Sequence, residues 1–199
     1  MVQTESACRT SALPGTMKWC GWGRESDHFE LADRPYLWPF LQRHLRISEQ
    51  QTRTAPVALD SILLSPRREN PLFLSRIAEI FPPLRWSIGD FDRLLHAYGK
   101  STRDLWRIRH GRVDFAPDCV VYPDNEDEVC QLLAAADQHG VVIIAFGGGT
   151  NVAGCLEVHR PDPRMVCTVN MRRMNRVLDV DPVSRIARVQ AGILGPDLE

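Results

Sequence analysis

The chain has 199 residues, of which 44% are hydrophobic and 25% are charged, within the ordinary range of globular proteins. Its 24 basic and 25 acidic residues nearly cancel, which argues against a nucleic-acid-binding protein and against a strongly basic membrane-surface protein. No apolar run approaches the roughly 20 residues that span a bilayer, and no targeting signal is evident. We therefore expect a soluble cytoplasmic protein, or a peroxisomal one if its source is eukaryotic.

The cysteines and histidines do not form a metal-site pattern. Neither a C-x-x-C motif nor a regular Cys/His spacing occurs, so the sequence predicts no metal site and no disulfide framework, only reduced thiols that are mainly buried. We expect a surface or helix-capping role for each of four scattered histidines. The residues concerned are Cys8, Cys20, Cys119, Cys130, Cys155, Cys167, His96, His110, His139 and His159.

The N-terminal half is predicted to be partly irregular. Residues 1–16 are polar and aperiodic, which predicts a disordered tail and makes Met17 a candidate native start. A helical arm is expected over 17–112, with one helix at Leu37–Leu45 and three more patterns around Leu72–Ile80, Phe91–Tyr98 and Arg103–Arg109. The basic face of the last helix is interpreted as solvated, with contact to a phosphate as the alternative.

From Pro117 the sequence predicts a βαβ unit. Cys119–Tyr122 is a strand, and a helix then starts at the N-cap Asn125 and stops at Gly140. The next strand, Val141–Phe146, is apolar throughout, which indicates cover on both faces. The spacing favours parallel pairing of the two strands with a right-handed crossover.

Three glycines and two small polar residues follow the second strand, in the order Gly147, Gly148, Gly149, Thr150 and Asn151. Such a turn can hold a phosphate with backbone N–H groups alone. This loop matches neither of the two common phosphate motifs, because Val152 replaces the last glycine of G-x-G-x-x-G, and Gly154 is followed by Cys155 and Leu156 where the nucleotide-triphosphate loop has G-K-[ST]. No acidic residue lies between Asp137 and Glu157, which suits a diphosphate. A ligand-free glycine turn is the alternative.

The remaining sequence predicts a strand at Met165–Asn170, a hairpin of Arg176–Asp181 with Arg185–Gln190, and a helix opening at Asp197. Asp179 and Asp181 are interpreted as the solvent face of a strand, and no residue pattern predicts a catalytic role. Because the sequence ends at Glu199 as this helix begins, we expect that the domain continues beyond it.

Four of these segments together resemble a known domain. They are Pro117-Asp118-x-Val120-Val121-x-Pro123, Gly147-Gly148-Gly149-Thr150, Met174-Asn175-Arg176 and Ala191-Gly192. The combination resembles the FAD-binding domain of the oxidases related to vanillyl-alcohol oxidase and p-cresol methylhydroxylase. Within that superfamily, Met17–Gly23 and Phe91–Gly111 resemble segments of the alkylglycerone-phosphate synthase family.

The resemblance implies an α/β (α+β) fold in which the helical arm, 17–112, precedes the first part of a p-cresol methylhydroxylase-type domain, 113–199. It implies FAD as the cofactor. The residues that it places around the FAD pyrophosphate are Ala145, Phe146, Gly147, Gly148, Gly149, Thr150 and Asn151.

The same resemblance implies a function in ether-lipid synthesis. In that family, the acyl group of acyl-dihydroxyacetone phosphate is exchanged for a long-chain alcohol, and the complete enzyme is expected to form a homodimer. This 199-residue chain alone is expected to be inactive. The alternatives are an FAD-linked oxidase or dehydrogenase of a 2-hydroxy acid, such as glycolate or D-lactate, and a truncated, inactive remnant.

Overall fold

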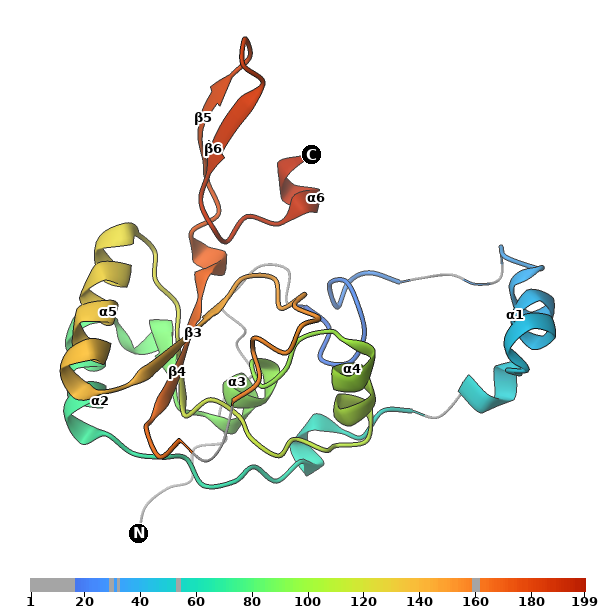
Figure 1. Cartoon of the computed structure of the whole chain (residues 1–199), viewed down its shortest axis with the longest axis horizontal. Coiled ribbons are helices and arrows are strands. Elements are labelled where there is room, and N and C mark those ends of the chain that lie inside the picture. Colours follow the sequence, from blue (N-terminus) through green and yellow to red (C-terminus); the bar gives the residue numbers. More distant parts are fainter. Residues whose placement is uncertain (1–16, 29–30, 32, 53–54, 159–161) are drawn as a thin grey trace.

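The computed structural model describes residues 17–28, 31, 33–52, 55–158 and 162–199, so the expected disordered tail and His159 lie outside the described residues. The fold is mixed α/β, as expected. A body of helices around a small sheet forms most of the molecule (Figure 1). Two elements extend away from this body: the helix α1 (Leu37–Leu45) and the hairpin of β5 (Val177–Asp181) and β6 (Ile186–Val189).

The sheet of the body has four strands in the order β1-β2-β4-β3. They are β1 (Trp86–Ser87), β2 (Cys119–Val121), β4 (Val166–Asn170) and β3 (Val142–Phe146). Strand β1 pairs antiparallel with β2, and the other two pairings are parallel. The parallel direction of β2 and β3 was predicted correctly, but their direct pairing was wrong. Strand β4 lies between them, and it is buried over its whole length, as expected of a central parallel strand.

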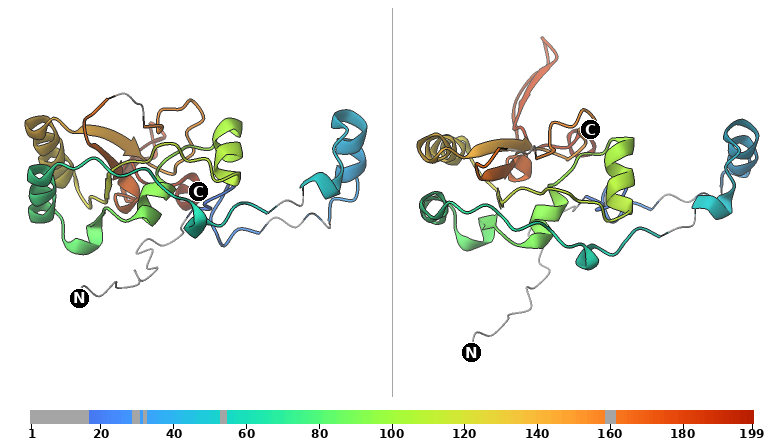
Figure 2. Two further views of the ribbon diagram at one scale, coloured as in Figure 1. Left: turned by 90° about the horizontal axis from the view of Figure 1, so that it is seen from below. Right: turned by 60° about the horizontal axis from the view of Figure 1, so that its bottom comes forward.

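One face of the sheet is covered by α2 (Pro71–Ile80) and α5 (Glu126–His139), which lie side by side in both views of Figure 2. Because side chains alternate along a strand, every second residue of β2 and β4 points to this face. These residues are Cys119, Val121, Cys167 and Val169, and they join Phe73, Ile77 and Leu132 in one hydrophobic core.

Helix α5 has the predicted start and stop. The Asn125 side chain accepts a hydrogen bond from the backbone N of Glu128 at 2.9 Å, and Gly140 takes a left-handed φ of 64°. Leu132 and Ala136 face the core as expected, whereas Leu133 is exposed and Ala135 takes its place.

The opposite face carries Val120, Thr168 and Asn170, and α3 (Asp90–Leu95) lies against it at β2. A second hydrophobic cluster connects this region to α4 (Thr102–Arg109). It contains Ile62, Leu94, Ala97, Tyr98, Ile108, Val113 and Ala116. The arm predicted over 17–112 thus contributes residues to the packing on both sides of the sheet.

The aromatic segment at the start of the arm, residues 17–24, is hydrogen-bonded to Lys100, which lies between α3 and α4. Met17 and Arg24 form an isolated antiparallel bridge, which closes this segment into a turn. The Lys100 ammonium donates hydrogen bonds to the carbonyl oxygens of Lys18, at 2.8 Å, and Trp19, at 3.2 Å. Burial lowers the pKa of this ammonium.

Two expectations about burial were wrong. Strand β3 does not have cover on both faces, since Ile143 and Ile144 are half-buried and Ala145 is exposed. The apolar composition of β3 predicted a buried central strand, but β3 lies at the edge of the described sheet. The five described cysteines are free, as predicted, but Cys130 and Cys155 are exposed and only Cys119 and Cys167 are fully buried.

The predicted hairpin is present, and all residues of β5 are exposed, including Asp179 and Asp181. The other short elements are 3-10 turns at Glu49–Thr52, Leu59–Ser61, Pro83–Arg85 and Met171–Arg173, and the helix α6 (Gly195–Leu198). Within the described ranges, no helix combines the length and the apolar character that crossing a membrane requires.

Candidate cofactor-binding site

The glycine-rich segment Gly147–Thr150, called the glycine loop below, leaves the carboxyl end of β3. The carboxyl ends of β2 and β4 lie at the same edge, because the three strands are parallel. This is the edge at which open α/β sheets commonly bind ligands.

The chain conformation of the loop requires glycine at one position and restricts side chains at another. Gly149 has a φ of 70°, and a Cβ there would lie 2.6 Å from Cζ of Phe146. A Cβ at Gly148 would lie 3.1 Å from Cδ2 of Leu194. At Gly147 the nearest atom to an added Cβ would be the carbonyl oxygen of Ala191, at 3.9 Å. A side chain on Gly148 or Gly149 would therefore displace its neighbours or strain the backbone.

The backbone N–H groups of the loop have no hydrogen-bond partner among the described residues. Gly147, Gly148, Gly149 and Thr150 donate no backbone hydrogen bond to any residue in the described part of the chain. Successive unpaired backbone amides can bind an anion where the chain turns their N–H groups toward one point. The loop itself contains no acidic residue, so the arrangement fits a diphosphate group.

The predicted site residues other than the three glycines differ in burial and in hydrogen bonding. Ala145 is exposed on β3, whereas Phe146 is buried beneath Gly149. Thr150 is exposed. The Asn151 side chain is already engaged, since its Oδ1 accepts hydrogen bonds from the backbone N of Ala153, at 3.1 Å, and of Cys155, at 3.0 Å. Phe146 thus packs against Gly149 of the loop, and Asn151 orders the segment that follows the loop.

A buried polar pair lies beneath Phe146. The ring of His96 lies 4.4 Å from the Phe146 ring, between centroids, and its Nε2 lies 2.8 Å from Nδ2 of Asn170. Its Nδ1 lies 2.7 Å from the carbonyl oxygen of Asp92, so the proton belongs on Nδ1 and Nε2 accepts the hydrogen bond from Asn170. Burial lowers the pKa of His96, although this backbone hydrogen bond acts in the opposite direction.

His96 caps the C-terminus of α3, which agrees with the expected capping role, but it is buried and not at the surface. Nearby, the Tyr122 hydroxyl donates to Oδ1 of Asp92 at 2.7 Å. Burial, with the adjacent Asp92 carboxylate, raises the pKa of Tyr122. Sequence reasoning missed this network, because its residues come from segments far apart in the chain.

The second glycine motif of the sequence lies beside the first. A Cβ at Gly192 would overlap the carbonyl oxygen of Met171, and its backbone N donates to the carbonyl oxygen of Met174 at 2.8 Å. This close packing holds Ala191 and Leu194 next to Gly147 and Gly148. The structure thus brings together two of the motifs on which the family resemblance depends.

The charged groups beyond the loop are paired. Glu157 accepts hydrogen bonds from Arg103, at 3.0 Å, and from Arg107, at 2.7 Å. The carboxylate that follows the loop is therefore neutralised by α4. The basic face of α4 was interpreted as solvated, and this is wrong for Arg107, which is half-buried and paired.

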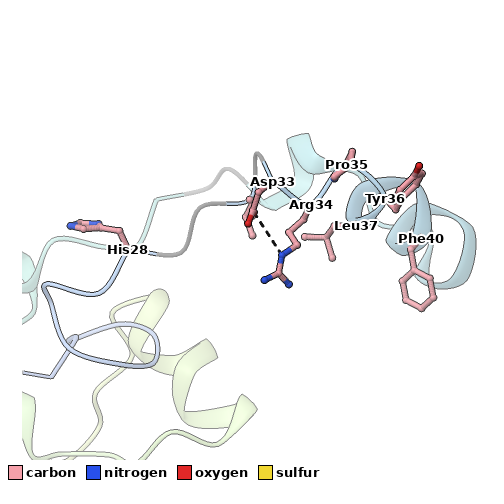
Figure 3. A pocket seen from close by; sticks show the side chains of 8 residues that line it. His28, Asp33, Arg34, Pro35, Tyr36, Leu37 and Phe40 are labelled. Atoms are coloured by element: carbon pink, nitrogen blue, oxygen red, sulfur yellow. Dashed lines mark ion pairs between the residues drawn. The ribbon is translucent and has the colours of Figure 1, made fainter. Parts of the chain in front are cut away.

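A separate surface hollow lies at α1, on the part of the chain that stands off the body (Figure 3). It is lined by His28, Leu31, Asp33, Arg34, Pro35, Tyr36, Leu37 and Phe40, and Asp33 pairs with Arg34 at 3.7 Å. Among the described residues, no group of histidines, cysteines and carboxylates could hold a metal ion. The glycine loop is the stronger candidate for a cofactor site.

Comparison with known proteins agrees with this choice. Residues 117–199 match the family described as FAD binding domain. The structure is also similar to p-cresol methylhydroxylase, with a TM-score of 0.51 and 13% identity over 63% of this chain and 23% of that protein, a likeness of fold alone. Residues 117–199 thus match an FAD-binding domain family, and the fold is that of part of a p-cresol methylhydroxylase-type domain.

The particular type of domain follows from closer relatives. The chain is 40% identical to alkyldihydroxyacetonephosphate synthase of Trypanosoma brucei brucei over 131 residues, covering 64% of this chain and 21% of that protein. It is 35% identical to the Dictyostelium discoideum synthase over 171 residues, covering 83% of this chain and 28% of that protein. A solved structure of an alkyldihydroxyacetonephosphate synthase has a TM-score of 0.79 and 32% identity, covering 92% of this chain and 38% of that one.

The domain is therefore of the alkyldihydroxyacetonephosphate synthase type, which is the alkylglycerone-phosphate synthase family expected from the sequence. The chain spans only 21% to 28% of the length of these two curated relatives and corresponds to an N-terminal-like part of them.

Proposed function

We propose that this chain binds FAD through the glycine loop and supplies the N-terminal, FAD-binding portion of an alkyldihydroxyacetonephosphate synthase-like enzyme. The observation that carries the proposal is the run of backbone N–H groups from Gly147 to Thr150 without partners among the described residues. These amides would hold the pyrophosphate of FAD.

The residues of this chain bind and orient the cofactor. The amides of the glycine loop would donate to the diphosphate oxygens, while Phe146 and Leu194 limit the positions that the loop can take. The flavin ring, when bound, supplies the capacity to accept electrons from a substrate. We assign no catalytic residue to this chain. The proposed overall reaction exchanges the acyl group of acyl-dihydroxyacetone phosphate for a long-chain alcohol.

Cofactor binding can be tested with two flavins that differ in one group. The purified 199-residue chain is titrated with FAD and with riboflavin, which has the same ring system but no diphosphate. We expect binding of FAD and little binding of riboflavin. Equal binding of the two flavins, or no binding of FAD, would contradict the proposal.

Gly148→Asp provides the matching variant. It places a side chain against Leu194 and a negative charge beside the diphosphate, so we expect FAD binding to be lost. The control is Gly195→Asp, because a Cβ at Gly195 meets no atom within 4 Å and the residue lies outside the glycine loop. If Gly148→Asp bound FAD with unchanged affinity, the assignment of the glycine loop to the FAD site would be wrong.

The enzymatic part of the proposal needs the rest of a synthase. The corresponding segment of the Dictyostelium discoideum synthase can be replaced by this chain, and the chimera assayed for bound FAD and alkyl exchange. We expect both to be retained. A chimera that is folded but lacks FAD, or that instead reduces a dye with glycolate or D-lactate, would contradict a synthase-type domain.

A further inference from the structure

The helical arm contacts the segment behind the glycine loop in two places. At the first, the backbone N of Lys100 donates a hydrogen bond to the carbonyl oxygen of Asn151 at 2.7 Å. A Cβ on the preceding residue, Gly99, would overlap that same oxygen. The two backbones can therefore approach this closely only because residue 99 is a glycine.

The second contact is the ion pair between α4 and Glu157. The Glu157 and Arg107 side chains are each 20% exposed, whereas the Arg103 side chain is 64% exposed. Solvent weakens the Arg103 pair more than the Arg107 pair, so Arg107 carries most of this contact. The Arg107 guanidinium also lies 5.4 Å from the centre of the Tyr98 ring, which fixes it from the other side.

The segment Asn151–Glu157 between these contacts is held together by its own hydrogen bonds. The Asn151 side chain accepts from the backbone N of Ala153 and Cys155, and the backbone N of Glu157 donates to Gly154 at 3.1 Å. The glycine loop runs directly into this folded segment. A displacement of the segment would consequently move the end of the glycine loop.

We propose that Arg107, through Glu157, and Gly99 with Lys100, through Asn151, are positioning residues for the cofactor loop. This proposal rests on the proposed binding of FAD by that loop. Glycines have a large conformational freedom, and fixing a loop before the ligand arrives lowers the entropy cost of binding. The helical arm thereby positions the loop that binds the cofactor.

The test compares two glutamates that each pair with an arginine. In the 199-residue chain, Glu157→Gln removes the negative charge that pairs with Arg107 and Arg103. The control is Glu79→Gln on α2, where the Arg76 to Glu79 pair is exposed and 2.6 Å long. We expect Glu157→Gln to raise the Kd for FAD about tenfold, or about 1.4 kcal/mol, and Glu79→Gln to leave it unchanged.

A second readout follows the loop without cofactor. Hydrogen exchange of the Ala153 and Cys155 amides should become faster in Glu157→Gln, while exchange in α5 stays the same. The charge-exchanged double variant Arg107→Glu with Glu157→Arg should restore much of the FAD affinity, which a general loss of stability would not allow.

The outcomes separate the two proposals. No FAD binding by the unaltered chain contradicts the proposed function. FAD binding that is the same in the unaltered chain and in Glu157→Gln overturns the positioning role, even if exchange in the segment becomes faster, because the contact would then be structural only. A tenfold loss also seen in Glu79→Gln would overturn it as well.

Discussion

Asn170 donates a hydrogen bond to His96 across 2.8 Å, although the two residues are 74 positions apart in the chain. Both side chains are buried, and the second nitrogen of the imidazole bonds to the carbonyl oxygen of Asp92. The ring, whose pKa burial lowers, lies beneath Phe146, and Phe146 in turn lies beneath Gly149. This column connects α3, β4 and the glycine loop.

The buried imidazole should make stability depend on pH. The pKa of His96 is lowered in the folded state, so below pH 6.5 the unfolded chain binds a proton that the folded chain does not. The free energy of unfolding should fall as the pH drops below 6.5, with this residue contributing at most about 1.4 kcal/mol per pH unit. Urea denaturation between pH 7 and pH 5 measures the slope. In His96→Gln the slope should be smaller, and an unchanged slope would contradict this account.

A methyl group at Gly99 should destabilise the protein. Gly99→Ala forces a Cβ onto the carbonyl oxygen of Asn151, so the two backbones must separate. Overpacking of this kind costs about 1–3 kcal/mol. Gly195→Ala is the control, because its added Cβ meets nothing within 4 Å. Equal stabilities of the two variants, measured by chemical denaturation, would show that the close approach is absent.

Thiol accessibility should divide four of the five described cysteines into two groups, with the half-buried Cys20 in neither. Cys130 and Cys155 are exposed, whereas Cys119 and Cys167 are fully buried, and the pKa of Cys167 is raised by its hydrogen bond to Cys119 and by burial. Alkylation of the native protein followed by mass spectrometry should therefore label the first pair and spare the second until the protein is denatured. Rapid labelling of Cys119 in the native state would contradict the packing of β2 on β4.

The apolar side chains of the β5 and β6 hairpin should promote association without adding stability. Val183 is 91% exposed, and Val180 and Ile186 are 60% and 64% exposed. Exposed apolar patches favour association with other surfaces. The double variant Val180→Lys with Ile186→Lys should stay monomeric at higher concentration in light scattering. Its free energy of unfolding should change by less than about 0.5 kcal/mol, as is usual for surface positions.

Local features of the fold were readable from the sequence. The helix predicted at Leu37–Leu45 has those bounds, and α5 starts at its Asn125 cap and stops at Gly140. These signals come from neighbouring residues and depend on hydrogen bonds within a turn or two. The glycine loop was also recognisable, since its chemistry resides in consecutive backbone groups.

Long-range features were not readable in the same way. Nothing in Val166–Asn170 indicates that it inserts between β2 and β3, because the order of parallel strands depends on packing across the sheet. The pairing of Glu157 with Arg107 joins residues 50 positions apart. His96 lies four residues after Asp92, which hints at its capping bond, but no local signal points to Asn170.

The central claim is that the backbone amides of Gly147–Thr150 hold the diphosphate of FAD. Backbone NMR of the ¹⁵N-labelled chain, titrated with FAD, reports each of these amides separately. We predict large shifts for the N–H signals of Gly147, Gly148, Gly149 and Thr150, and the same shifts with ADP, which carries the diphosphate without the flavin. Saturable FAD binding that leaves these four signals unmoved, or no binding at all, would contradict the account.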